Sequence, residues 1–184
     1  MRDHAIIETE RLRLRPVGEP DADAIQAAAS AFEVADTMIS IPHPYPHGEA
    51  LRYVRTRITE RSDGYAEVFA VEQASNGAFS GLIEVRDIDR EHDQAELSFW
   101  LAPAAWGRGY MSEIVQAILR YGFESLSLNR LYAYHMTRNP ASGRVLEKNG
   151  FHREGTLRQR VRKWGKREDV ALWAILADDW RASQ

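Results

Sequence analysis

Residues 94–119 constrain the fold most, because they predict a strand, a glycine turn and a helix with almost no chain between them. Residues 94–101 alternate between apolar and polar side chains, as a strand with one buried face does. Trp-Gly-Arg-Gly-Tyr follows at 106–110. Apolar residues then recur at the spacing of a helix that packs on a sheet, namely Met111, Ile114, Val115, Ile118 and Leu119.

The rest of the chain predicts a mixed sheet with helices on its faces. Asn76-Gly77 is a strong hairpin signal, and Asn139-Pro140 is a helix start with Asn as N-cap and Pro at the first helical position. Asn149-Gly150 is a left-handed helix stop. Further helices are predicted at 20–31 and 49–61, and further strands at 12–17, 65–72, 79–89, 131–136, 157–164 and 170–176, with another from 151 onward. A meander of strands that later alternates with helices favours this architecture.

Composition bounds the class of protein. The chain has 184 residues, of which 44% are hydrophobic, and this is enough to bury the core of one domain. The net charge of −3 gives no basis for nucleic acid or an anionic membrane as the main partner. Cysteine is absent, which excludes a disulfide framework, thiolate metal sites and a cysteine nucleophile. The N-terminal apolar run is too short for a signal peptide or a membrane span, so we expect a cytoplasmic location and no membrane partner.

The two glycines at 107 and 109 allow two interpretations. They could serve only a tight turn between strand and helix. They could also let successive backbone N–H groups converge on an anion at the helix N-terminus, where those groups have no intrahelical partner. A dinucleotide-binding turn is excluded because Ser112 stands where the third glycine is needed. A P-loop is excluded because Gly-Lys-Ser/Thr is missing.

Several segments, taken in order, resemble the GNAT acyltransferase superfamily and, within it, the RimJ/RimL-like branch of ribosomal-protein N-terminal acetyltransferases. The resemblance covers about residues 8–177. It is carried by Glu-Arg-Leu-Arg-Leu-Arg at 10–15, Ala-Glu-Leu-Ser-Phe-Trp-Leu at 95–101, Trp-Gly-Arg-Gly-Tyr at 106–110, Asn-Pro-Ala-Ser at 139–142, Leu-Glu-Lys-Asn-Gly-Phe-His-Arg-Glu-Gly at 146–155 and the Gly165 to Asp169 ending.

The resemblance implies an α/β (α+β) GNAT fold, with one mixed, mostly antiparallel sheet of about seven strands and about four helices, splayed between the fourth and fifth strands. It implies one acyl-CoA N-acyltransferase domain over residues 1–184. The donor would be acetyl-CoA, with no metal, and the acceptor a protein N-terminal amine. The alternatives are a small amine (polyamine, amino acid or drug) as acceptor, or a non-catalytic acetyl-CoA sensor. We expect a monomer or a homodimer.

The same resemblance implies which residues bind the CoA pyrophosphate and thiol region. They are Phe99, Trp100, Leu101, Trp106, Gly107, Arg108, Gly109, Tyr110, Met111, Ser112, Asn139 and Ser142. Met111 departs from the family, which keeps a small residue there, and we expect its side chain to be buried against the sheet. An N-cap role is by itself sufficient reason for Asn139.

The absence of cysteine favours direct attack of the amine in a ternary complex over an acyl-enzyme. Glu96 is the candidate base, directly or through water, and Ser142 would protonate the departing thiolate. Backbone N–H groups near Phe99 and Trp100 would polarise the thioester carbonyl. Glu96 could instead be a solvated strand residue or pair with an arginine. His135 is the rival base, although a lone His in an apolar strand is more often a hydrogen-bonded core residue.

Three further segments bear on function. The Pro-rich loop at 41–48 and the helix after it are interpreted as an acceptor-binding flap. His43 and His47 lie in this loop, but no carboxylate or Cys close by completes a metal site. The basic run at 158–167 is interpreted as the solvated face of a strand in preference to a nucleic-acid or ribosome contact.

Overall fold

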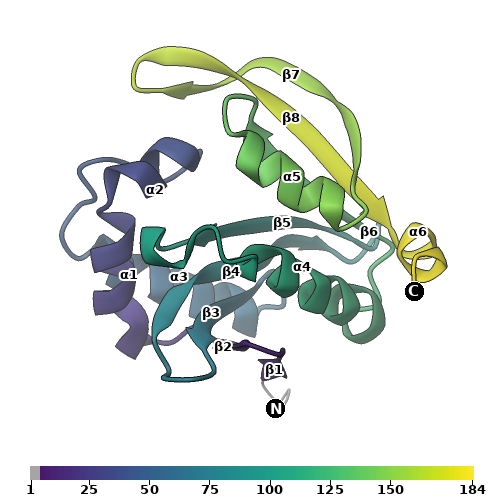
Figure 1. Cartoon of the computed structure of the whole chain (residues 1–184), viewed down its shortest axis with the longest axis horizontal. Helices are drawn as coiled ribbons and strands as arrows, with labels where there is room; N and C mark the ends of the chain where they lie inside the picture. Colours follow the sequence, from purple (N-terminus) through teal and green to yellow (C-terminus); the bar gives the residue numbers. More distant parts are fainter. Residues whose placement is uncertain (1–4) are drawn as a thin grey trace.

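One mixed sheet with the strand order β1-β2-β3-β4-β5-β6-β8-β7 organises the computed structural model, which describes residues 5–184 (Figure 1). Only β5 and β6 pair in parallel; the other neighbours are antiparallel. The mixed, mostly antiparallel sheet is as predicted, with β1 as an additional edge strand and residues 152–163 forming one strand where two were predicted. The bounds are β1 (Ile7–Glu8), β2 (Leu12–Pro16), β3 (Glu67–Gln73), β4 (Phe79–Asp89), β5 (Gln94–Leu101), β6 (Arg130–Met136), β7 (His152–Lys163) and β8 (Lys166–Leu176).

Helices cover both faces of the sheet, with α4 in front of it and α3 behind it in Figure 1. Their bounds are α1 (Ala22–Ala29), α2 (Phe32–Thr37), α3 (Glu49–Ser62), α4 (Tyr110–Arg120), α5 (Pro140–Lys148) and α6 (Ala177–Ala182). Short 3₁₀ turns lie at Glu19–Asp21 and Pro103–Ala105, and a π-helical turn, Tyr121–Ser125, continues α4. The predicted helices at 20–31, 49–61 and 139–149 correspond to α1, α3 and α5, whereas α2 and α6 were not predicted.

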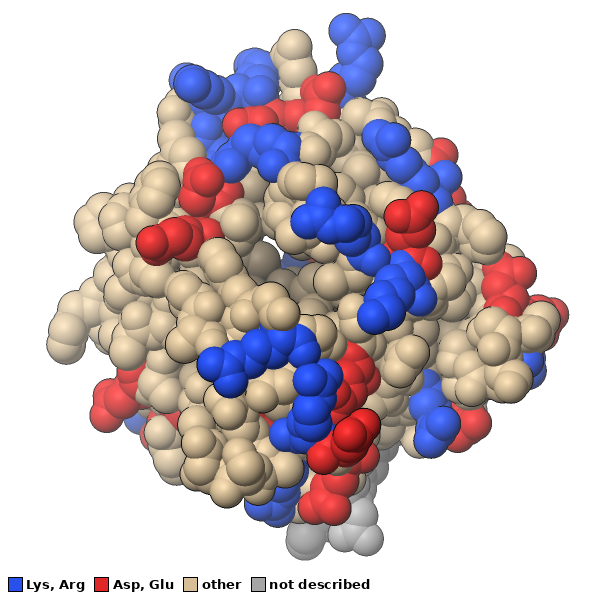
Figure 2. All heavy atoms as spheres, viewed as in Figure 1, with Lys and Arg blue, Asp and Glu red and all other residues tan. Residues whose placement is uncertain are grey.

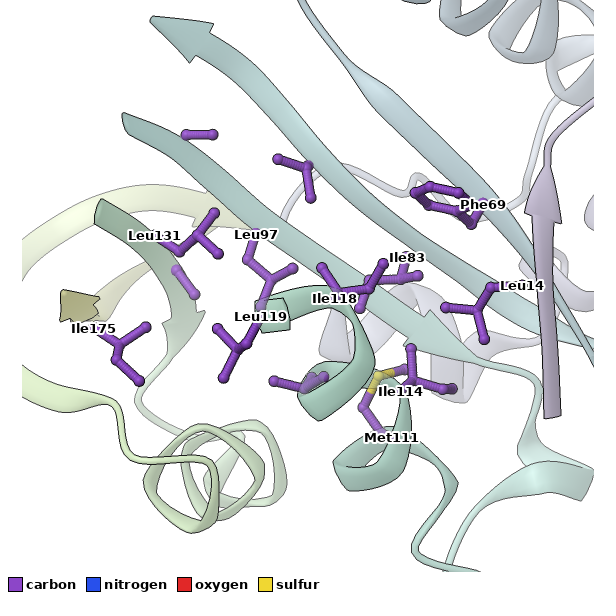
Figure 3. Packing of buried hydrophobic residues seen from close by; sticks show 14 of the residues in the cluster. Leu14, Phe69, Ile83, Leu97, Met111, Ile114, Ile118, Leu119, Leu131 and Ile175 are labelled. Carbon is purple, nitrogen blue, oxygen red and sulfur yellow. The ribbon is translucent and has the colours of Figure 1, made fainter. Parts of the chain in front are cut away.

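The larger core lies between the sheet and α4. Ile114 and Ile118 are fully buried and lie close to Ile83 and Leu97 of the sheet (Figure 3). Met111 is buried in the same cluster, as expected from its place in the apolar stripe. A second apolar cluster lies on the opposite face and includes Val54 of α3. Burial on one face of α4 therefore fixes how its N-terminus is presented to the end of β5.

The sheet opens between β5 and β6. Parallel pairing is limited to Gln94 with Arg130, Ala95 with Leu131 and Glu96 with Tyr132, after which the strands separate. This confirms the predicted splay between the fourth and fifth predicted strands. Beyond Glu96, the side of β5 that faces β6 has no strand partner, so its backbone N–H groups are available for other contacts.

Gly81 of β4 provides a test of the packing beside this opening. It has φ +150, and a Cβ built on it would lie 2.2 Å from the Trp100 carbonyl oxygen. Gly81→Ala is therefore expected to lower the free energy of unfolding by about 3 kcal/mol, because both the backbone and β5 must shift. Gly77→Ala is the matched control, since Gly77 also has positive φ but would meet no atom within 4 Å. Urea denaturation measures the free energy of unfolding of both variants. If both lose the same small amount of stability, the prediction is contradicted.

Candidate active site

A groove of about 430 Å³ runs from the end of β5 along the glycine turn to α5; we call it the loop groove. Of the residues that the resemblance assigns to CoA, only Arg108 is not part of its lining. The lining residues are Thr37, Met38, Phe99, Trp100, Leu101, Ala105, Trp106, Gly107, Gly109, Tyr110, Met111, Ser112, Asn139, Ala141, Ser142, Arg144, Val145 and Lys148. This face of the molecule is hollowed near its centre, with Lys and Arg side chains along the rim (Figure 2).

The glycine turn adopts a conformation that favours glycine. Gly107 has φ +72 and Gly109 has φ +76. Gly109 is the N-cap of α4 and has no side chain to accept a hydrogen bond from the first turn. The first N–H groups of α4 therefore remain available beside the groove, at the positive end of the helix dipole.

Two side chains hold this turn in place. The Trp106 indole donates a hydrogen bond to the Leu101 carbonyl at 2.8 Å, which ties the turn to β5. Arg11 donates to the Arg108 carbonyl at 2.9 Å and forms an ion pair with Glu113 of α4 at 2.7 Å. Because Arg11, which lies outside the turn, holds the Arg108 carbonyl by a hydrogen bond, the turn is preformed and a ligand need not order it.

Two cations of α5 lie beside the groove. Arg144 and Lys148 are four residues apart, hence on one face of the helix, and both are exposed. Neither forms an ion pair with another residue of the described chain, 5–184. The loop groove thus combines free helix N–H groups with two unpaired positive charges, a suitable environment for phosphate groups.

A second cavity of about 270 Å³, which we call the inner pocket, continues from the loop groove into the opening between β5 and β6. Thr37, Met38, Phe99 and Ser142 line both cavities, so the two meet at these side chains. The other lining residues of the inner pocket are Ile39, Ser40, Arg86, Glu96, Leu97, Ser98, Tyr134, His135, Arg160, Val161 and Val170.

Glu96 lies in the inner pocket, half-buried and paired with Arg86. Arg86 Nη2 donates to Glu96 Oε1 at 2.5 Å from the directly opposite position on β4. Arginine pairing was one of the two alternatives to a role as base, and the structure shows that pairing. No residue of 5–184 donates a hydrogen bond to the other oxygen, Oε2. Glu96 is therefore oriented through one oxygen and presents the other to the pocket.

Arg86 also lies near a second carboxylate, Glu84, which is buried. Burial raises the pKa of Glu84 above its usual range, and the nearby Arg86 charge opposes this shift. Burial acts to lower the pKa of Arg86, but the charges of Glu96 and Glu84 raise it overall. The guanidinium thus stays charged behind Glu96 and fixes its side chain.

Ser142 and Asn139 form a hydrogen-bonded pair where the cavities meet. Asn139 Nδ2 donates to Ser142 Oγ at 3.0 Å. Asn139 occupies the predicted N-cap position of α5, but its side chain makes no capping hydrogen bond. The expected side-chain cap is therefore wrong: with ψ at 77, the amide is directed to Ser142. Because Ser142 Oγ accepts this bond, its own hydroxyl proton is free to point into the cavity.

His135 has both ring nitrogens engaged. Nδ1 lies 2.9 Å from the Met136 carbonyl, so it carries the proton, and Nε2 accepts from the Trp173 indole at 2.9 Å. Burial lowers the pKa of His135, which keeps the ring neutral. A Cβ on Gly143 would lie 3.0 Å from Nε2, so α5 packs tightly against the ring. The environment is that of a hydrogen-bonded core histidine, with no free nitrogen for a substrate proton.

The backbone of β5 presents alternate N–H groups to the opening. Ala102 N donates to Ser80 O of β4 at 2.8 Å. Since N–H directions alternate along a strand, Trp100 also faces β4, whereas Phe99 and Leu101 face the opening. The predicted N–H pair near Phe99 and Trp100 is thus corrected to Phe99 and Leu101. The Trp100 side chain is buried on the opposite face of the sheet, in the cluster that contains Phe79.

Residues 37–40 cover one side of the inner pocket and are anchored by the tip of the β7–β8 hairpin. Arg138 pairs with Asp36 at 2.9 Å and with Glu168 at 3.1 Å. Trp164 Nε1 donates to Asp36 at 2.7 Å. The hydrogen bonds from Arg138 and then from Trp164 lower the pKa of Asp36, which keeps it charged.

The segment interpreted as an acceptor-binding flap, the loop at 41–48 and the helix after it, lies outside the inner pocket. Except for the preceding residues 37–40, no part of the 31–62 region lines the inner pocket, so neither 41–48 nor α3 contributes to it. Sequence reasoning also missed Thr37, Met38, Arg86, Tyr134 and Arg160. The basic run at 158–167 was a signal for Arg160, but its alternation indicated only a solvated strand. Nothing in the sequence marked the other four.

The described part of the chain, residues 5–184, contains no cluster of three or more His, Asp or Glu side chains that could hold a metal ion. Across the same residues, no helix has the length and apolar character that crossing a membrane requires.

Comparison with known proteins identifies the family. Residues 11–152 match the acetyltransferase (GNAT) domain model. The chain is 38% identical over 179 residues to the probable N-acetyltransferase YjcK of Bacillus subtilis (strain 168), which covers 95% of this chain and 98% of that protein. The chain therefore belongs to the GNAT acetyltransferase family. It is an acetyl-CoA-dependent N-acetyltransferase, and its mixed sheet with covering helices is the GNAT fold.

Two solved structures are similar over nearly the whole chain. RimL, a ribosomal L7/L12 alpha-N-protein acetyltransferase in complex with coenzyme A, has a TM-score of 0.88 at 22% identity and covers 95% of this chain and 99% of that one. The spermidine N-acetyltransferase of Vibrio cholerae, in complex with CoA and spermine, has a TM-score of 0.84 at 25% identity and covers 94% and 99%. These two proteins act on different amines, so similarity to them leaves the acceptor of this chain open.

Proposed function

We propose that this chain transfers the acetyl group of acetyl-CoA directly to a primary amine, with both substrates bound at once and a protein N-terminal amine as acceptor. The observation that carries the proposal is the meeting of the loop groove and the inner pocket at Phe99 and Ser142. A thioester that enters from one side and an amine from the other would lie within reach of each other there, and such positioning is a large part of catalysis.

The loop groove is the proposed acetyl-CoA site. The N–H groups at the start of α4, released by Gly107 and Gly109, would bind the pyrophosphate. Arg144 and Lys148 would add positive charge for the remaining phosphate. The N–H groups of Phe99 and Leu101 would then receive the thioester end of the pantetheine arm. Leu101 is fixed through its carbonyl by Trp106, so its N–H is held in place.

In the proposed reaction the amine nitrogen attacks the thioester carbonyl carbon. Glu96 takes a proton from the ammonium, directly or through water, before or during attack. The Phe99 and Leu101 N–H groups stabilise the oxyanion. When the tetrahedral intermediate collapses, the C–S bond breaks and Ser142 donates its hydroxyl proton to the thiolate sulfur. The nitrogen loses its second proton to water as the intermediate collapses, which leaves a neutral amide. Solvent then restores the proton on Ser142 and removes the one on Glu96.

The experiment that tests the function is a thiol-release and intact-mass screen of peptide N-termini against polyamines, amino acids and drug-like amines. Transfer to peptide N-termini is the expected result. Transfer only to small amines would contradict a protein N-terminus as the acceptor but would support direct acetyl transfer from acetyl-CoA. Tight acetyl-CoA binding with no turnover on any amine, unchanged by Glu96→Gln, would contradict catalysis and indicate a sensor.

Ser142→Ala is expected to lower kcat by about 10²-fold while leaving acetyl-CoA affinity nearly unchanged, because only the proton donor is lost. Rapid-mix thiol release gives kcat, and calorimetry gives the affinity. Ser30→Ala is the control, since Ser30 only donates to the Gln26 carbonyl at the end of α1. A large affinity loss with normal kcat would show that Ser142 binds the donor and does not donate a proton.

A further inference from the structure

Arg160 is the uncompensated cation of the inner pocket. It lies on β7, lines the pocket, and places its guanidinium 5.9 Å from the centre of the Tyr134 ring on β6. No carboxylate of residues 5–184 forms an ion pair with it. This is a long cation–π contact, and Arg160 is exposed, so the contact leaves the positive charge of the guanidinium uncompensated.

The other charges of the pocket are already balanced. Glu96 is the only carboxylate in the lining, and it pairs with Arg86 at 2.5 Å. His135 is neutral, because burial lowers its pKa. Paired charges contribute little net field, so the lining of the inner pocket carries one excess positive charge from Arg160.

Carboxylates on the neighbouring segments are also engaged. Asp36 and Glu168 both pair with Arg138. Asp169 accepts a hydrogen bond from the Gln159 backbone N–H at 2.7 Å, on the residue next to Arg160. Figure 2 shows Lys and Arg side chains together with several Asp and Glu side chains over the upper part of the molecule, where β7 and β8 run. None of these carboxylates forms an ion pair with Arg160, and neither does Asp87, which lies near Arg86 and Tyr132.

We propose that Arg160 selects acceptors that carry a carboxylate a few bonds away from the attacked amine. The inference rests on the proposed transferase function and specifies its acceptor. A planar guanidinium binds a carboxylate through two parallel hydrogen bonds. The same charge repels a second ammonium group. The pocket therefore favours a free amino acid or a peptide with an acidic second residue over a polyamine.

The test compares acceptors that differ only in charge beside the amine. Three C-terminally amidated peptides would begin Ser-Asp, Ser-Asn and Ser-Lys, and free serine would be compared with serinamide. The expected kcat/KM is about tenfold higher for Ser-Asp than for Ser-Asn, and lowest for Ser-Lys and for spermidine. The serine pair shows whether an α-carboxylate serves as well as a side-chain carboxylate. Equal values across both series, or a preference for spermidine, would overturn the proposal.

Arg160→Gln assigns the preference to this residue, and Arg158→Gln is the matched control. Arg158 is exposed on the same strand but does not line the inner pocket. Arg160→Gln is expected to remove the preference, so that the ratio of kcat/KM for Ser-Asp to kcat/KM for Ser-Asn falls from about ten to about one, whereas Arg158→Gln retains the wild-type ratio. An unchanged preference in Arg160→Gln, or an equal loss in both variants, would contradict the role of Arg160.

A binding measurement separates this inference from the proposed function. Calorimetry with the CoA-loaded protein measures the affinity for Ser-Asp and Ser-Asn whether or not turnover occurs. Tighter binding of Ser-Asp that is lost in Arg160→Gln supports the charge selection, even if no peptide is acetylated and the transferase proposal fails. Turnover of all peptides with equal affinities supports the transferase and overturns the role of Arg160.

Discussion

Glu96→Gln is expected to lower kcat/KM by about 10²–10⁴-fold near pH 7, because the variant cannot take the proton that an α-ammonium must lose before attack. The α-amino group has a pKa of about 7.7–8.0, so the deficit should shrink as the pH rises above that range and the free amine accumulates. Thiol-release rates measured from about pH 6 to pH 9.5 give the profile, and a deficit of the same size at every pH would exclude a role as base.

Arg86→Gln separates loss of the base from loss of the ion pair. Both variants remove the Arg86–Glu96 ion pair, but Arg86→Gln retains the carboxylate. Arg86→Gln is expected to lose less activity than Glu96→Gln, and its activity should depend on pH in the same way as that of the wild type. If the two variants behave alike, Glu96 serves only to pair with Arg86, as the structural alternative holds.

Gly109→Val is expected to weaken acetyl-CoA binding by about 100-fold or more while the domain remains folded. A β-branched residue at φ +76 costs on the order of 1–3 kcal/mol, and the turn relieves this strain by rotating the N–H groups away from the loop groove. A steric clash is not the expected cause of the weaker binding, since a Cβ at Gly109 would meet only Arg11, at an ordinary contact distance of 3.6 Å. Calorimetry measures the affinity, and thermal unfolding with circular dichroism verifies the fold.

Gly64→Val is the matched control for strain. Gly64 has φ +82 in the turn after α3, far in sequence from the loop groove, and a Cβ there would meet no atom within 4 Å. It should show a similar loss of stability with normal acetyl-CoA affinity. Equal affinity losses in both variants would mean that general destabilisation, and not the conformation of the glycine turn, weakens binding.

The elements that could be predicted are those whose signal lies within one short stretch of chain. The apolar stripe from Met111 to Leu119 predicted α4 because burial of one helix face is visible as a period in sequence. Gly150 predicted the end of α5 because a left-handed stop, here φ +82, depends on one residue type. In contrast, α2 has six residues, which is too short for a period to be distinguished.

Contacts between elements could not be predicted in the same way. Arg86 faces Glu96 only because of the β4–β5 register, and that register shifts between Arg86 and Asp89 at an irregularity with no marker in sequence. The Asn139–Ser142 bond depends on a backbone angle outside the usual range for an N-cap. Residue types thus indicated the chemistry of the site, whereas its partners depended on tertiary geometry.

The two cavities are built largely from different stretches of chain. The glycine turn and α4 line only the loop groove, whereas β7 and β8 contribute only to the inner pocket. Substitutions at hairpin positions that face the inner pocket, away from the Trp164–Asp36 contact, can therefore change that pocket without touching the proposed acetyl-CoA site. If the loop groove binds the donor as proposed, related proteins that modify different amines should differ most at the hairpin positions that line the inner pocket, Arg160, Val161 and Val170.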